Sequence, residues 1–521
     1  MAIMNSTIEK KLWDAADALR TNSKLKSSEY ATPVLGLIFL RFADYRFTLA
    51  KDKIDKKFKN SRRTPSQIDY QKMGVLYIPE KARYSYLLQL PEREDVQQAV
   101  IQAMKDIETE NTSLKDVLPK QYKRVPKDIL ISLLKTFSEI EMEENNGDTF
   151  GAIYEYFLGK FASSEGQKGG EFFTPTSLVR LIVEILEPYK GKLLDPACGS
   201  CGMFVQSAKF VNRHSGNANQ DISIFGQENI ADTVRLGKMN LAVHGLEGDV
   251  KECNTYYQNI HGCYQKMNYI MANPPFNAKG VDKERVKGDK RYPFGIPKND
   301  NANYLWIQEF YSAMKPGEGK AGFVMANSAA DARGSELEIR KQIIQEKAVD
   351  VMISIGSNFF YNVTLPCTLW FFDNVKLKHN SKDTVLFIDA RNIFTQVDKA
   401  HREFSTAQIE YIANIVRLYH NKPIENMEGG ADLLKELFPE GKYQDVLGLC
   451  KVATIDEIED QGWSLAPGRY VGTPVEEFDE EDFYEKFVSL HSELRKLNEE
   501  ANQIERAIEE NFLLLVNGND K

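Results

Sequence analysis

Short apolar runs between residues 192 and 390 constrain the fold of this 521-residue chain more than any other feature. Each run ends in small or polar residues, and segments with helical spacing separate the runs. Strands that alternate with helices in this way are typical of a parallel sheet covered by helices on both faces. The pattern therefore predicts a doubly wound α/β domain that binds its ligands at the carboxyl ends of the strands. The runs are KLLDPACGS (192–200), ISIFGQE (222–228), MNYIMANPPF (267–276), AGFVMANS (321–328), DVMISIG (350–356), TLWFFDN (368–374) and VLFIDA (385–390).

The chain on either side of these runs has a helical pattern. Ser6 and Glu9 form a capping box ahead of spaced apolar residues, which predicts an amphipathic helix at the start. Helical spacing continues as far as residue 160 and returns in the last 40 residues, whereas the pattern from 400 to 470 is mixed. We therefore expect a helical domain over 1–160, the α/β domain over 161–470 and a C-terminal helical segment over 471–521.

Composition limits the classes of protein that the chain can represent. Six cysteines in a chain of this length are too few for a disulfide framework, and no apolar stretch reaches the length of a membrane span. The N-terminus also lacks the apolar core of a signal peptide, so we expect a soluble, cytoplasmic protein with no membrane association. The net charge of −9 is opposite to that of a protein that holds DNA mainly by its own surface. Any role on nucleic acid must then use local basic patches or a partner.

The first strand-end motif is glycine-rich and acidic. The run Asp195-Pro-Ala-Cys-Gly-Ser-Cys-Gly202 allows a ligand to approach the backbone closely, and its carboxylate can hold a cationic or hydroxyl group. A plain tight turn explains the glycines equally well. The spacing Cys198-x-x-Cys201 is also found in redox and zinc sites, but no second cysteine pair or nearby histidine completes a ligand set. No metal site is therefore predicted, and the absence of a GxxxxGK[ST] run argues against a P-loop NTPase.

Two further motifs follow at the ends of the next strands. Glu228 can accept both hydroxyls of a ribose, although a carboxylate that starts a helix is an equal interpretation. After the run YIMA, Asn273 and Pro274 can present their oxygens as a rigid pair of acceptors, because the two prolines restrict the chain. Paired acceptors suit a planar amino group, and Phe276 could stack on its ring. A rigid Pro-Pro turn without chemistry is the alternative for this motif taken alone.

These motifs occur together and in order, and here the chain resembles a known family. DPACGSCGMF, GQE and NPPF, preceded by GEFFTP at 170–175, look like the amino-methyltransferases that use S-adenosyl-L-methionine. More narrowly, the chain resembles the modification (methyltransferase) subunit of type I restriction-modification systems. The likeness extends to the helical N-terminal domain, to SNFFYNVTLPCTLWFF late in the sheet and to GWSLAPGRYVG before the last helix.

The resemblance implies a role for each matching residue. Glu171 to Thr176 and the turn from Gly199 to Gly202 would enclose the methionine part of the cofactor, and Glu228 would bind its ribose. Related enzymes often place an acidic residue after the third strand to contact the adenine, but this chain has Asn254 there, so Asp249 or Glu252 could take that role. The residues assigned to the cofactor are Glu171, Phe172, Phe173, Thr174, Pro175, Thr176, Asp195, Gly199, Ser200, Cys201, Gly202, Glu228 and Asn254.

The implied reaction is methyl transfer to adenine N6 in double-stranded DNA. The base would be flipped out of the duplex, with Asn273, Pro274, Pro275 and Phe276 as the catalytic motif. No metal and no strong base is required, because the sulfonium provides its own leaving group. In such systems a specificity subunit reads the sequence and a restriction subunit cleaves. The alternatives are methylation of cytosine N4 or of a glutamine amide, a noncatalytic assembly module, and an NAD-dependent dehydrogenase, which the missing GxGxxG pattern disfavours.

Two segments suggest contacts with partners. Residues 277–303 lack clear periodicity and contain more Lys and Arg than Asp and Glu, which suggests a DNA-contacting loop formed by Lys283, Arg285, Lys287 and Lys290, or merely a solvated loop. In the last helix, apolar residues alternate at spacings of four and three, as in the seam of a coiled coil. We expect this seam to pack against the specificity subunit, with two methyltransferase copies flanking it; folding back on its own domain is the alternative. The seam residues are Phe483, Phe487, Leu490, Leu494, Leu497, Ala501, Ile504 and Ile508.

Overall fold

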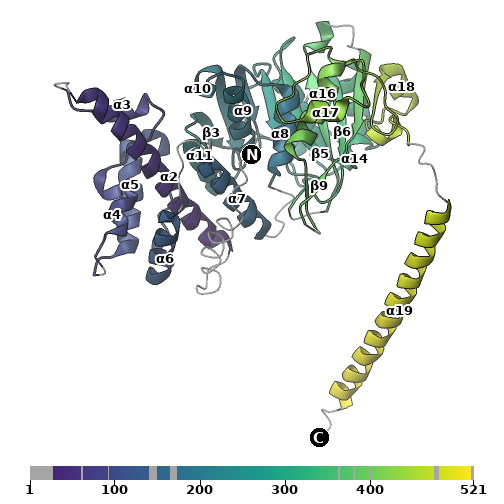
Figure 1. Ribbon diagram of the computed structural model, residues 1–521. Coiled ribbons are helices and arrows are strands. Elements are labelled where there is room, and N and C mark those ends of the chain that lie inside the picture. The colour runs from purple at the N-terminus through teal and green to yellow at the C-terminus, as the bar shows by residue number, and fades with distance from the viewer. Residues whose placement is uncertain are drawn as a thin grey trace. The chain divides into compact units, whose positions relative to one another are not determined.

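The computed structural model describes residues 27–517 except 60–62, 92, 140–148, 165–172, 362–363, 379–382, 399 and 474–479. The chain divides into two compact units, Met1–Val471 and Gly472–Lys521. The first contains a helical region and a large sheet covered by helices, and the second contains one long helix (Figure 1). The helix predicted from Ser6 lies outside the described residues. No helix in the part of the chain that the structure describes is long and apolar enough to cross a membrane.

The helical region runs from α2 to α7. Helix α2 (Ser27–Phe58) is buried almost all round from Tyr30 to Ala43, because apolar residues there occur at nearly every position. The same hydrophobic core contains Met239 and Val243 of a helix that covers the sheet, so the helical region is packed onto the α/β domain rather than tethered to it. The other helices are α3 (Gln67–Gln71), α4 (Tyr84–Leu88), α5 (Val96–Glu110), α6 (Lys127–Ser138) and α7 (Thr149–Ser164), with 3-10 turns at Glu80–Ala82, Thr112–Leu114 and Tyr122–Arg124.

The α/β domain is built on a nine-stranded sheet with the order β11-β8-β6-β7-β5-β4-β1-β2-β3. All strands run in one direction except β7 and β11, which are antiparallel to their neighbours. This mostly parallel sheet confirms the predicted fold class. The strands are β1 (Gly191–Asp195), β2 (Ile222–Glu228), β3 (Gly248–Glu252), β4 (Tyr269–Ala272), β5 (Lys320–Ala326), β6 (Val349–Ile355), β7 (Cys367–Asp373), β8 (Thr384–Asp389) and β11 (Cys450–Thr454), with a separate pair β9 (Thr395–Gln396) and β10 (Arg402–Glu403).

Helices cover both faces of the sheet, and each face has its own core. Successive residues of a strand point to opposite faces, and thus Leu193 belongs to one core cluster and Leu194 to the other. One cluster includes residues of α8 (Thr176–Leu186), α9 (Gly202–Arg213), α11 (Ala231–Val243) and α16 (Thr406–Tyr419). The other includes residues of α13 (Asn303–Ala313), α14 (Asn327–Ala330), α15 (Ser335–Gln345) and α18 (Ile455–Asp460). The remaining short helices are α10 (Ala218–Asp221), α12 (Lys283–Val286) and α17 (Gly430–Leu434).

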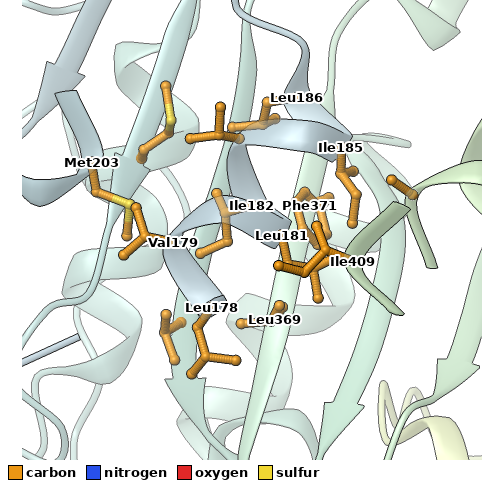
Figure 2. Close-up of a cluster of buried hydrophobic side chains, with 14 of the residues drawn as sticks. Leu178, Val179, Leu181, Ile182, Ile185, Leu186, Met203, Leu369, Phe371 and Ile409 are labelled. Carbon is orange, nitrogen blue, oxygen red and sulfur yellow. The ribbon is translucent and has the colours of Figure 1, made fainter. Parts of the chain in front are cut away.

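Helix α8 is the central element of the first face. Figure 2 shows its apolar side chains against Leu369 and Phe371 of β7, with Met203 of α9 and Ile409 of α16 beside them. Strand β5 also packs closely against α8. A Cβ placed on Gly322 of β5 would lie 3.0 Å or less from side-chain atoms of α8. This close contact holds α8 against the sheet, and the segment from Phe173 to Thr176 precedes and opens this helix.

The second unit is helix α19 (Glu480–Asn517). Within this unit, the seam residues Leu490, Leu494, Leu497, Ile504 and Ile508 are all more than half exposed. An apolar stripe of this length in water is typical of a surface that a partner helix covers. Its partner stays a prediction.

Candidate active site

The three sequence motifs lie at neighbouring strand ends. Strands β4, β1 and β2 are adjacent and parallel, so Asn273, Asp195 and Glu228 all lie at the same edge of the sheet. The strand order reverses between β1 and β4, which is where ligands bind in doubly wound folds. The motifs that lie 78 residues apart in the chain, Asp195 and Asn273, are thus brought to one crevice.

The turn from Pro196 to Gly202 forms the floor of this crevice. Gly199 and Cys201 both have positive φ, 49° and 65°, which bends the backbone sharply from β1 into α9. The turn is held by the Cys198 amide, which donates to the Gln227 carbonyl at 2.9 Å, and by the Cys201 amide, which donates to the Cys198 carbonyl at 2.7 Å. A Cβ on Gly199 would meet nothing within 4 Å, so the backbone here is open to a ligand.

The cleft above this turn collects residues from both regions of the first unit. The space between its lining residues amounts to roughly 630 Å³, part of it open to solvent. Of the residues predicted for the cofactor or for catalysis, those that line it are Phe173, Thr174, Thr176, Asp195, Gly199, Ser200, Gly202 and Asn273. Glu171 and Phe172 lie outside the described residues. Pro175 caps the start of α8, and the Cys201 side chain is buried beneath the turn.

Asp195 is a buried carboxyl group at the end of β1. Its Oδ1 accepts a hydrogen bond from the Ala197 amide at 3.0 Å. Burial raises the pKa of Asp195 well above its usual value, and the nearby Glu228 carboxylate raises this pKa further, despite the opposing effect of the Ala197 hydrogen bond. A cationic group bound in the cleft would favour the ionised form of Asp195.

Glu228 ties the glycine turn to the neighbouring strand. Its Oε2 accepts from the Gly199 amide at 3.1 Å, and its Oε1 accepts from the amides of Asn229 and Ile230 at 2.8 and 3.0 Å. Each carboxylate oxygen has two lone pairs, so Oε1 is already occupied by its two bonds, and Oε2 can accept one further bond from a hydroxyl donor. The orientation of Glu228 is therefore fixed by the protein.

The three candidates for an adenine contact lie in different places. Glu252 ends β3 beside Glu228, whereas Asp249 lies nearer the start of the strand and pairs with Lys251 at 2.8 Å. Asn254 follows the strand, and its Oδ1 accepts from the Tyr256 amide at 3.1 Å, which fixes the side chain in a turn. None of the three lines the cleft. Their position at the strand end favours Glu252 or Asn254 over Asp249.

The Cys198-x-x-Cys201 pair is buried packing. The hydrogen bond between the Cys198 and Cys201 side chains raises the pKa of the Cys198 thiol, and burial raises this pKa further. A thiol with a raised pKa is a poor nucleophile and a poor metal ligand. Among the described residues no group of three or more His, Cys, Asp or Glu side chains could hold a metal ion.

The Asn-Pro-Pro-Phe motif contributes Asn273 to the lining of the cleft. The Asn273 Nδ2 donates to the Thr174 hydroxyl at 2.9 Å, so the side chain's acceptor is its other end, Oδ1. Phe276 is only 6% exposed and packs edge-to-face on Phe360, with ring centroids 6.0 Å apart. The ring therefore offers little free surface in this conformation, and stacking of a base on it requires the neighbouring loop after β6 to move.

The basic loop 277–303 is more ordered than its sequence suggests. Arg291 is buried and donates to the carbonyl of Thr255 at 2.7 Å and to Glu309 at 3.1 Å, which anchors the loop to the domain. The Lys283 ammonium donates to the Lys298 carbonyl at 3.1 Å, so this lysine supports the loop itself. Three of the four residues predicted to contact DNA remain exposed on the loop: Arg285, Lys287 and Lys290.

Several residues of the cleft could not be predicted from the sequence. Glu155 and Leu158 come from α7 in the helical region, and Asn240 comes from α11, where its Nδ2 donates to the Ser200 carbonyl at 2.7 Å. One local signal pointed to Glu155, because it is the only acidic residue in the apolar helix Thr149–Ser164. The other cleft residues not predicted are Val179, Ala197, Cys198, Met203 and Gln206.

Comparison with known proteins identifies the family of this chain. The family model described as N-6 DNA Methylase matches residues 145–479, and that of the HsdM N-terminal domain matches residues 8–137. The chain belongs to the N-6 DNA methylase family. More narrowly, it is a modification subunit of the type I restriction-modification class, because full-length relatives carry that description.

Two such relatives are similar over most of the methylase. The type I restriction enzyme MjaIX methylase subunit of Methanocaldococcus jannaschii is 37% identical, over 96% of this chain and 90% of its own. The type I restriction enzyme HindI methylase subunit of Haemophilus influenzae is 36% identical, over 78% of this chain and 89% of its own. The solved type I methyltransferase subunit from Streptococcus thermophilus superimposes with a TM-score of 0.70, covering 89% of this chain and 99% of that one at 22% identity, which supports the fold.

These findings confirm the predicted family and activity. The methylase is an adenine-specific DNA methyltransferase that modifies N6 as the subunit of a type I system. No comparison favours methylation of cytosine or of glutamine, or a noncatalytic role.

Proposed function

We propose that the cleft between α7, α8 and the glycine turn binds S-adenosyl-L-methionine as the methyl donor. The observation that carries this proposal is the charge of the cleft: its described lining includes the carboxyl groups of Glu155 and Asp195 and no Lys, Arg or His. Such a lining suits a ligand that carries an ammonium and a sulfonium group. When bound, the cofactor supplies a methyl group activated by the positive sulfur.

The residues of the methylase then fit the parts of that ligand. The open backbone at Gly199 and the amides that begin α9 suit a carboxylate, because the N-terminus of a helix favours negative charge. Asp195 suits the ammonium group, and Glu228 suits the ribose hydroxyls. Asn254 or Glu252 is assigned to the adenine, because both lie next to Glu228 at the strand end.

The target amine is assigned to Asn273 and Pro274. The bond from Asn273 Nδ2 to Thr174 orients the amide, which directs Oδ1 as the acceptor. Two acceptors that hold the hydrogens of an adenine amine would favour a pyramidal nitrogen with an available lone pair. Adenine in a duplex is out of reach, so the base must be flipped, and Phe276 contacts it once the loop around Phe360 moves.

Contact with DNA is assigned to the exposed cations of the loop 277–303. Arg285 lies 4.0 Å from the centre of the Tyr257 ring and Lys290 lies 4.5 Å from that of Tyr264, which positions both charges without neutralising them. Within the described part of the chain, Lys287 is paired with the exposed Glu284, at 3.6 Å. Changing Arg285, Lys287 and Lys290 to Gln should reduce the salt slope of DNA binding by about 0.9 for each phosphate that the loop no longer neutralises. The control is Lys442→Gln, an exposed lysine elsewhere on the domain.

The partners are assigned from helix α19 and from the family. We expect its exposed seam to pack on the specificity subunit, with two methylase copies for each specificity subunit and a restriction subunit that adds cleavage. Deletion of residues 476–521 should leave the first unit folded and able to bind the cofactor, but unable to co-purify with the specificity subunit. Recovery of the intact complex after this deletion would refute the assignment.

Methyl transfer by the assembled enzyme tests the whole proposal. The methylase, co-purified with its specificity subunit, should transfer a labelled methyl group to DNA, and nucleoside analysis should find it on adenine N6. Asn273→Ala should abolish transfer but keep cofactor affinity, whereas Asn392→Ala, at an exposed loop position, should change neither. Normal transfer by Asn273→Ala would rule out the amine-acceptor role.

A further inference from the structure

One wall of the cofactor cleft comes from the helical region. Glu155 and Leu158 of α7 line the cleft together with the strand-end residues of the α/β domain. Other side chains of α7, including Ile153 and Phe157, belong to the core of the helical region. The backbone at Glu155 is therefore positioned by that core, whereas the sheet carries most of the rest of the site.

The Glu155 carboxylate is held by three side chains of the α/β domain. Its Oε1 accepts from the Lys209 ammonium at 2.8 Å, and both of its oxygens lie 3.3 Å from the Gln206 amide nitrogen. The His244 ring nitrogen lies 3.7 Å away. Gln206 also lines the cleft, so these contacts keep the carboxylate at the surface of the cleft. They join α7 to α9 and to the end of α11.

The charge of Glu155 is only partly compensated. The Lys209 side chain is 36% exposed, whereas that of Glu155 is 16% exposed. Arg180 also interacts electrostatically with Glu155. Water screens the lysine more than the carboxylate, so the Lys209 charge by itself does not cancel the negative potential on the cleft side. A positive charge that enters the cleft is attracted by this potential, and a neutral group of the same shape is not.

We propose that Glu155 is a specificity-determining residue that makes the cleft prefer the cationic methyl donor over its demethylated product. The inference rests on the proposed cofactor. In the reaction the sulfur–methyl bond breaks, the sulfur keeps the electron pair, the methyl group bonds to N6, and the amine loses a proton. The product, S-adenosyl-L-homocysteine, thus has one positive charge fewer than the donor. Glu155 favours exchange of product for donor, and it does so only while α7 is packed against α9.

Calorimetric binding of both ligands to the full-length chain tests this role. Glu155→Gln keeps the size of the side chain and one acceptor oxygen but removes its charge. This variant should weaken binding of the donor about fivefold, which is the effect expected for a solvent-screened charge pair. It should change the affinity for the product by less than about twofold. Lys209→Met, which removes the counter-charge, should shift the ratio of the two affinities in the opposite direction. Glu155→Asp keeps the charge and should keep the preference for the donor.

The controls separate this inference from its premise. Glu247→Gln, at an exposed carboxylate, should leave both affinities unchanged. Equal weakening of both ligands by Glu155→Gln, or a shift of the same sign in Lys209→Met, would mean that Glu155 only supports the wall. If Glu155→Gln does not fold, the ratios of donor affinity to product affinity in Glu155→Asp and Lys209→Met test the role of Glu155 instead. Failure of the unmodified chain to bind either ligand would instead contradict the proposed cofactor site.

Discussion

Replacing Gly237 by alanine should show how closely α11 supports the cofactor turn. A Cβ at this position would lie 2.7 Å from the Cys201 sulfur and 2.9 Å from the Gly199 carbonyl oxygen. Neither atom can withdraw easily, because Cys201 is completely buried and the Gly199 oxygen belongs to the backbone. The turn must therefore shift, and the bond from the Gly199 amide to Glu228, 3.1 Å long, shifts with it.

The expected magnitude combines two opposing effects. Alanine in a helix interior is favoured over glycine by about 1 kcal/mol, and overpacking a core costs about 1–3 kcal/mol. The free energy of unfolding should then fall by roughly 0–2 kcal/mol, the difference of these two. The affinity for S-adenosyl-L-methionine should fall by about tenfold or more, because the displaced turn is the floor of the cleft.

A matched glycine supplies the control. Gly159 lies within helix α7, and a Cβ there would be 3.8 Å from Tyr361, an ordinary contact. Gly159→Ala should therefore raise the thermal midpoint and leave cofactor affinity unchanged. In Gly237→Ala, the added change Cys201→Ala removes the nearer of the two clashing atoms and should restore part of the affinity. Unchanged calorimetric affinity in Gly237→Ala would refute the reasoning.

Three further predictions concern buried groups. Burial raises the pKa of Glu309 from 4.5 to about 7 despite the opposing effect of Arg291, so stability should fall as the pH rises from about 4.5 to about 7, and chemical unfolding of Glu309→Gln should show a smaller fall. Because the pKa of Asp195 is raised in the free protein, binding of the donor should release a proton, and the affinity for the donor should rise with pH. Calorimetry in buffers of different ionisation enthalpy should detect the released proton, and Asp195→Asn should not release it. Ile182→Ala, in the cluster of Figure 2, should lower the free energy of unfolding by about 2–5 kcal/mol, with Ile182→Val at about 0.5–1.5 kcal/mol; equal losses in the two variants would contradict tight packing of α8.

Seven of the nine strands of the sheet were predicted from the sequence because their signal is local, whereas β3 and β11 were not among the predicted runs. The run ISIFGQE predicted β2 over 222–228, which are its observed bounds. β11 was missed, because its residues CKVAT carry a weak apolar pattern, and the strand is held by antiparallel pairing with β8, more than 60 residues away in the chain. The direction of β7 could not be predicted either. A buried strand has the same apolar run in both directions, and only its neighbours β5 and β6 define which one is adopted.

The amino-acid sequence by itself determined the candidate residues of the site. Asp195, Glu228 and Asn273 could be assigned because an acidic, glycine-rich or proline-locked strand end is a property of a few consecutive residues. Tertiary structure alone decided which distant groups complete the cleft. Glu155 reaches it through packing of α7, Lys283 is withdrawn into its own loop, and Phe276 is covered by Phe360. Such contacts join residues far apart in the chain, and their geometry depends on how the whole core packs, which no short stretch of sequence specifies.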